Sequence, residues 1–220
     1  EKNKQIDLGF DIGIFNALNV VVDFYKRTSD IVMPANIPNF NGISGSVYMN
    51  AGQIENKGIE IQVSATPFKG EFSWETTLSW SKNNNKILSL ANNQNQLANA
   101  KAGTKWSNVI RNYVGRPMGD MYMLKVIGTF NTEEDLAKYA TNGTQGIGDL
   151  IFEDYKKDGT IDVNDYQLVG NYQPDFTFGW NNTFKYKDLD LAITIDGQCG
   201  GNVIYAAARA FSLNRYDDNV

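Results

Sequence analysis

The chain has 220 residues, of which 20% are charged and 42% are hydrophobic, and its formal net charge is −5. This balance excludes a disordered polymer and gives no electrostatic reason to expect nucleic acid as a partner. Histidine is absent and Cys199 is the single cysteine, which excludes an internal disulfide, a thiolate metal cluster and the commonest general base. We therefore predict that the chain is not an enzyme.

Apolar and polar residues alternate along several segments, as they do in strands that separate two environments. Between Glu71 and Lys82, for example, Phe72, Trp74 and Trp80 share one face, opposite charged and hydroxyl side chains. In chain order, the alternation predicts strands over 6–15, 18–32, 50–66, 71–86, 172–187 and 188–198, with a weaker seventh run over 118–130.

The connections between these strands are sorted by length. Tight turns fall near Asn16-Ala17, Pro67–Gly70 and Lys187-Asp188, and long excursions fall near 33–46, 87–115 and 131–170. Short turns on one side and long loops on the other are typical of outer-membrane barrels. We predict an all-β fold: an antiparallel transmembrane β-barrel segment of about seven strands, with the long loops on the extracellular side.

Two long loops carry features of their own. Thr132 followed by three acidic residues predicts a short helix over 132–140. The stretch 87–112, rich in Asn, Gln, Ala and Lys, is interpreted as a solvated, partly helical loop. Within it, Trp106 and Arg111 are the candidate substrate-binding residues, because an indole ring and a guanidinium group stack on ligands.

The segment from Asp154 to Asp165 has the spacing of a twelve-residue calcium loop. Its candidate ligands occupy positions one, five, seven, nine and twelve, and are Asp154, Asp158, Thr160, Asp162 and Asp165. Lys156 stands at position three, where an oxygen ligand is expected, so the motif is degenerate there. The alternative interpretation is an acidic surface turn held by Asx-type hydrogen bonds. We expect no required cofactor, and a structural calcium ion is the candidate.

Three stretches carry a resemblance to a known family. They are Asn50–Glu60 (NAGQIENKGIE), Asn19–Asp30 (NVVVDFYKRTSD) and Gly115–Gly119 (GRPMG), and they occur in the family's order. The chain resembles the SusC/RagA-type TonB-dependent transporters of the Bacteroidetes. The resemblance implies a barrel of about 22 strands, of which residues 1–220 are one part, with the plug domain and the barrel ends outside this chain.

The same resemblance implies a location in the cell outer membrane, in contact with its lipid, and import of oligosaccharides, peptides or other large nutrients. It also implies a SusD-like surface lipoprotein as partner, and the TonB complex as a second partner through the missing N-terminal region. The alternative function is a soluble β-sandwich carbohydrate-binding module with a calcium loop, whose apolar faces would be buried against a second sheet.

Overall fold

The computed structural model describes residues 2–15, 17–36, 46–91, 96–102 and 106–205. The chain divides into two compact units, and each is described by itself. The first comprises Glu1–Leu97, Asn112–Met118 and Gln173–Asn202, and the second comprises Ala98–Arg111, Gly119–Tyr172 and Val203–Val220. Within the described ranges, no helix is long and apolar enough to cross a membrane.

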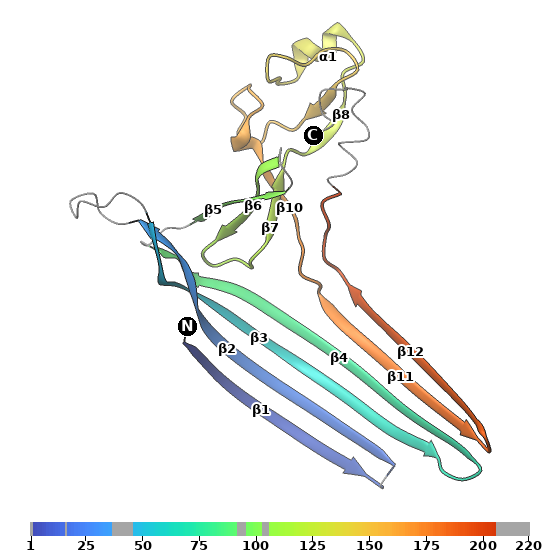
Figure 1. The fold of residues 1–220 in the computed structure, drawn as a ribbon. Helices are drawn as coiled ribbons and strands as arrows, with labels where there is room; N and C mark the ends of the chain where they lie inside the picture. The colour runs from blue at the N-terminus through green and yellow to red at the C-terminus, as the bar shows by residue number, and fades with distance from the viewer. Residues whose placement is uncertain (1, 16, 37–45, 92–95, 103–105, 206–220) are drawn as a thin grey trace. The chain divides into compact units, whose positions relative to one another are not determined.

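The first unit is built on one antiparallel sheet of six long strands (Figure 1). Its order is β1-β2-β3-β4-β11-β12, so sequence neighbours pair except where β4 meets β11. The strands are β1 (Asn3–Ile14), β2 (Leu18–Asn36), β3 (Ser46–Phe68), β4 (Phe72–Ser89), β11 (Phe176–Tyr186) and β12 (Leu189–Cys199). The six strands predicted from strict alternation are confirmed.

The turns at one end of this sheet are short. Lys187 and Asp188 join β11 to β12, and Lys187 adopts a φ of 53°. A positive φ at this position matches the twist of a two-residue hairpin to that of its strands. At the other end, β2 is joined to β3, and β4 to β11, by the long excursions. The predicted sorting of connections by length is therefore confirmed for this sheet.

A small apolar cluster closes the end of the sheet away from the tight turns. Ile54, Ile87, Leu90 and Ala91 are buried together, with Met118 packed against them. The segment around Arg116 pairs with β4 at this end, because the N–H of Ile87 donates to the carbonyl of Arg116 at 2.9 Å. The rest of the sheet has little buried core, as expected for a wall with an environment on each side.

The second unit contains two small sheets. One has the order β10-β7-β6-β5 and the other pairs β8 with β9. The elements are β5 (Gln96–Ala102), β6 (Trp106–Tyr113), β7 (Asp120–Met123), β8 (Val126–Thr129), α1 (Glu133–Lys138), β9 (Leu150–Phe152), the 3-10 helix η3 (Val163–Asp165) and β10 (Gln167–Asn171). The helix predicted over 132–140 is confirmed as α1, with Thr132 as its N-cap.

Two sequence predictions differ from this arrangement. The stretch 87–112, predicted as a solvated, partly helical loop, contains the strands β5 and β6. The weaker seventh run, 118–130, is not a strand of the six-stranded sheet but forms β7 and β8 in separate small sheets. Gly119, with a φ of 87°, breaks the extended backbone just before β7, which limits that strand to four residues.

Candidate functional site

The six-stranded sheet has one continuous apolar face. The cross-strand pairs place successive apolar rows there: Phe10, Val22, Ile61, Trp80 and Phe178, then Ile12, Val20, Val63, Leu78, Trp180 and Ile195. Because side chains alternate across a strand, these residues all project to the same side of the sheet. The face therefore presents a broad apolar band across every strand.

The side chains of this band are largely uncovered. Ile12 is 52% exposed, Ile195 45% and Leu191 56%. A β-sandwich requires a second sheet to bury such a face, and within the described part of the first unit no second sheet packs on it. An apolar band of this width is instead what hydrocarbon contact requires.

Aromatic rings gather on the apolar face beside the tight turns. Trp74 stacks on Phe184 with ring centroids 5.7 Å apart, and Phe68 stacks on Trp74 at 6.1 Å. The two polar side chains within the band here are covered by indole donors: Trp74 Nε1 donates to Asn182 Oδ1 at 3.1 Å, and Trp180 Nε1 donates to Thr76 Oγ1 at 2.9 Å. Amphipathic rings at one border of an apolar band are the pattern of an interfacial aromatic girdle.

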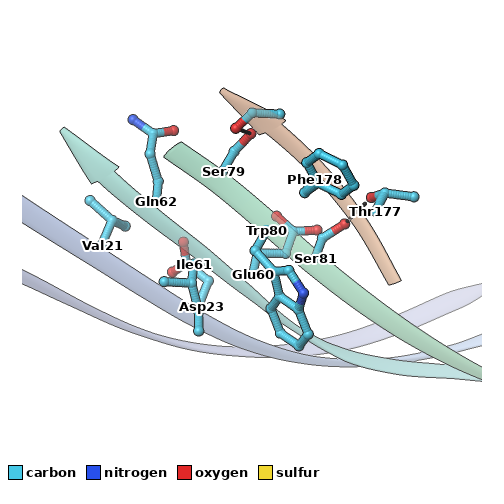
Figure 2. A pocket seen from close by; sticks show the side chains of 11 residues that line it. Val21, Asp23, Glu60, Ile61, Gln62, Ser79, Trp80, Ser81, Thr177 and Phe178 are labelled. Carbon is cyan, nitrogen blue, oxygen red and sulfur yellow. Dashed lines mark hydrogen bonds between the residues drawn. The ribbon is translucent and has the colours of Figure 1, made fainter. Parts of the chain in front are cut away.

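The opposite face of the sheet is polar. One row runs through Asp23, Glu60, Ser81 and Thr177, and the next through Val21, Gln62, Ser79 and Gly179. These two rows border a hollow of about 370 Å³, shown in Figure 2. Hydrogen bonds between neighbouring strands fix its floor, with the Ser81 and Thr177 hydroxyl oxygens 2.8 Å apart and Ser79 Oγ donating to the Gly179 carbonyl at 3.3 Å.

A second hollow of about 350 Å³ adjoins the first and shares Asp23 and Glu60 with it. Its other lining residues are Gln5, Asp7, Tyr25 and Arg27. The Tyr25 hydroxyl donates to Asn83 Oδ1 at 3.1 Å, and Asn83 Nδ2 donates in turn to Asn56 Oδ1 at 3.2 Å. The arrangement offers hydrogen-bond donors and acceptors over a wide wall, which suits passage of a polar solute rather than chemistry on it.

Gly58 makes this network possible, and sequence reasoning missed its role. A Cβ built at Gly58 would meet the carbonyl oxygen of Lys82 and the phenol group of Tyr25, so the phenol ring lies directly across the glycine backbone. Gly58 belongs to the NKG stretch that carried the family resemblance. Glycine inside an alternating strand is a recognisable signal of such close approach.

The acidic loop folds around two of its predicted ligands. Asp154 accepts N–H groups from Lys157, Asp158 and Gly159 at 2.5–3.2 Å, and Asp165 accepts those of Lys156 and Asp162 at 3.1 and 2.9 Å. Asp158 and Asp162 each accept a backbone N–H two residues ahead, from Thr160 and Asn164. The Asx-type bonds of the alternative interpretation are therefore all present.

Asp165 is the buried carboxylate of this loop, whereas Asp158, Thr160 and Asp162 are exposed. Burial raises the pKa of Asp165, but the N–H donors of Asp162, Lys156 and Tyr155, helped by the charge of Lys156, outweigh it and lower the pKa overall. Among the described residues, no group of three or more acidic or cysteine side chains is placed to hold a metal ion. Calcium binding stays a prediction.

Arg111 contacts residues of the second unit that its place in the sequence did not predict. Its guanidinium lies over the rings of Tyr122 and Tyr166, 5.3 and 5.0 Å from the centroids, and Nη2 donates to the Val163 carbonyl at 3.1 Å. Arg111 thus fastens the acidic loop to β6. Trp106 lies at the start of β6, and its side chain is outside the described residues, so ligand stacking by this pair stays a prediction.

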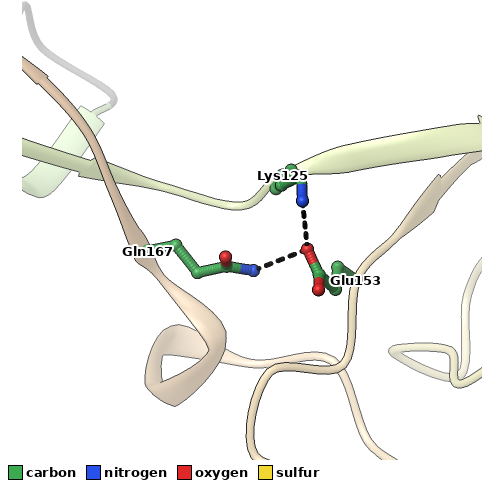
Figure 3. A network of polar contacts seen from close by, with 3 residues as sticks. All are labelled: Lys125, Glu153 and Gln167. Carbon is green, nitrogen blue, oxygen red and sulfur yellow. Dashed lines mark hydrogen bonds and ion pairs between the residues drawn. The ribbon is translucent and has the colours of Figure 1, made fainter.

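A polar clasp closes the base of the 124–166 excursion (Figure 3). Lys125 Nζ lies 2.8 Å from Glu153 Oε2, and Gln167 Nε2 donates to the same oxygen at 3.2 Å. These two partners outweigh the effect of burial and lower the pKa of Glu153. The clasp joins three segments far apart in sequence, and no local motif signals it.

Comparison with known proteins shows which receptors this two-faced sheet resembles. The chain is 29% identical over 93% of its length to TonB-dependent receptor P3 of Formosa agariphila, and 29% identical over 98% to TonB-dependent receptor P26 of the same bacterium. It is 23% identical over 93% of its length to the TonB-dependent receptor SusC of Bacteroides thetaiotaomicron. Over more than nine tenths of its length, the chain resembles a segment of these TonB-dependent receptors.

The match to solved structures agrees on the fold. The chain superposes on the RagAB peptide importer in its 'open-open' state with a TM-score of 0.70 and 19% identity, covering 90% of this chain and 20% of that one. No family model matches. The segment spans about a fifth of the length of the curated relatives it matches. These relatives are receptors and transporters rather than enzymes, and they place the segment in the outer membrane.

Proposed function

We propose that this segment forms part of the wall of an outer-membrane transporter that imports large nutrients. The observation that carries the proposal is the division of one sheet into an apolar face and a polar face over all six strands. The apolar face contacts outer-membrane lipid, and the polar face, with its adjoining hollows, lines the solute path. A wall of this kind binds solute weakly at many polar groups and carries out no chemistry.

The proposed solute is an oligosaccharide or a peptide. A peptide is supported by one structural relative, which is named as a peptide transporter. The two-chain name RagAB supports a SusD-like surface lipoprotein as partner of the receptor that contains this segment. The name that the curated relatives share, TonB-dependent receptor, supports energy coupling through the TonB complex.

Deletion of the full-length receptor gene in its native host tests this function. The deletion strain is grown on oligosaccharides or on peptides as sole nutrient, and compared with the same strain carrying the gene on a plasmid. Selective loss of growth on one class, restored by the plasmid, identifies the solute. Unchanged growth and unchanged uptake of both classes would contradict a transport function.

Isolation of the receptor from outer membranes tests the partner. An affinity tag on the receptor is expected to recover one surface lipoprotein in equal amounts. Recovery of the receptor alone under mild detergent, with the lipoprotein fraction unchanged by deletion of the receptor, would contradict a SusD-like partner.

A further inference from the structure

Backbone N–H groups of the acidic loop 154–165 donate hydrogen bonds to the loop's own carboxylates. An ionised carboxylate has about four acceptor sites. Three of those on Asp154 accept backbone N–H groups, and both oxygens of Asp165 accept at least one. The loop is also fastened from outside, since Arg111 donates to Val163 and the N–H of Ile161 donates to the Thr141 carbonyl at 3.2 Å. The fold of the loop is thus specified by protein donors.

The donor set does not fit a calcium ion. Calcium takes six to eight oxygen ligands, and a loop of this type supplies one of them from position three. Lys156 occupies that position, and its backbone N–H donates at 3.1 Å to Oδ1 of Asp165, the carboxylate at position twelve. Lys156 therefore removes one oxygen ligand and adds a positive charge to the loop.

The net charge of the loop also argues against a bound calcium ion. Asp154, Asp158, Asp162 and Asp165 contribute −4, and Lys156 and Lys157 contribute +2, so the net charge is −4 + 2 = −2. An oxygen ligand in place of Lys156 would leave at least −3 to be neutralised. A divalent cation is the usual solution to that repulsion, and a lysine within the loop is another.

We propose that Lys156 is an internal cation that replaces calcium, so that this loop keeps its fold without a metal ion. The Asx turns then supply the geometry, Arg111 and Thr141 supply the attachment, and Lys156 supplies the charge. The proposal does not depend on the transport function, because it concerns the folding of one extracellular segment.

The test compares three forms of the full-length purified receptor: wild type, Lys156→Asp and Lys157→Asp. Lys156→Asp restores an oxygen ligand at position three. Lys157→Asp makes the same charge change at a position that supplies no side-chain ligand, and its φ of 59° is one that aspartate accepts. Calcium affinity is measured by calorimetry and by Tb³⁺ luminescence, which Tyr155 and Tyr166 sensitise. Hydrogen exchange of the loop amides is measured with calcium and with EGTA.

We expect calcium binding by Lys156→Asp alone, in the 10⁻⁴–10⁻³ M range of extracellular modules. Loop amides of the wild type are expected to exchange at the same rate in calcium and in EGTA, within about twofold. Calcium binding by the wild type within threefold of Lys156→Asp would overturn the proposal, as would an EGTA-dependent rise in wild-type exchange. Absence of binding by all three forms would also overturn it, because Lys156 would then not be the residue that replaces the ion.

Discussion

Arginine substitutions on the two faces of β3 distinguish a membrane-spanning wall from a soluble sheet. Val63 lies in the middle of the apolar band, paired with Val20 and Leu78. Gln62 is its neighbour on the polar face. The substitutions Val63→Arg and Gln62→Arg therefore add the same charge one residue apart, on opposite sides of the sheet.

The expected cost follows from the depth of Val63. Along β4 the band runs from Lys82 to Phe72, ten residue steps (82 − 72 = 10). At ~3.3 Å per residue and a tilt of ~45°, this is about 23 Å along the membrane normal, close to the ~25 Å apolar band of outer-membrane barrels. Leu78, the partner of Val63, lies four steps from one border and six from the other. An arginine at mid-depth costs about 2–4 kcal/mol.

The assay is unfolding of the full-length receptor in phospholipid vesicles, followed by the heat-shifted band on gels and by tryptophan fluorescence. Val63→Arg is expected to lower the free energy of unfolding by about 2–4 kcal/mol, and Gln62→Arg by less than about 1 kcal/mol, because its guanidinium stays in the polar space. Equal losses for the two variants, or a larger loss for Gln62→Arg, would refute the assignment of the faces.

Three further outcomes are expected. Gly58→Ala lowers the free energy of unfolding by about 1–3 kcal/mol, because its Cβ meets the Lys82 carbonyl; Gly13→Ala, which meets nothing within 4 Å, is the matched control in the same denaturation assay. Arg111→Lys increases hydrogen exchange of the loop amides by about tenfold, since lysine cannot hold both rings and the carbonyl; unchanged exchange would contradict the fastening role. The N–H of Asn131, followed by the contacts of Thr132, lowers the pKa of Asp135 despite partial burial. Its contribution to α1 is therefore present above the unfolded carboxyl pKa and is lost as pH falls through the lower folded pKa, which NMR titration of α1 amides will follow.

The strands of the membrane wall were predictable because one physical constraint acts on every residue in them. Each side chain between Phe72 and Lys82 faces either apolar or polar surroundings, so the alternation is strict and locates the strand. The extensions of β2 and β3 were not predicted, because Pro34 has no N–H to donate to a ladder. There β2 has β3 as its one neighbour among the described strands, since β1 pairing ends at Ser29, and the proline is tolerated.

The second unit was less predictable because its contacts are long-range. β5 and β6 lie in a stretch of Asn, Gln and Ala without alternation, so only the pairing of β5 with β6, and of β6 with β7, stabilises them as strands. The capping box of α1 is local, and its residues predicted the helix correctly. The role of Arg111 depends on Tyr122 and Tyr166, which lie 11 and 55 residues away (122 − 111 and 166 − 111), and no spacing in the sequence relates them.

The most direct test of the membrane wall is a nitroxide scan of β4 from Ser73 to Ser81 in the full-length receptor, in outer-membrane vesicles and in a Cys199→Ser background. Collision rates are measured with oxygen, which partitions into lipid, and with a water-soluble nickel chelate. A membrane wall predicts period-two behaviour, with oxygen favoured at Trp74, Thr76, Leu78 and Trp80 and the chelate favoured at the positions between them. Equal accessibility to the chelate at both sets of positions would contradict a sheet with one face in lipid.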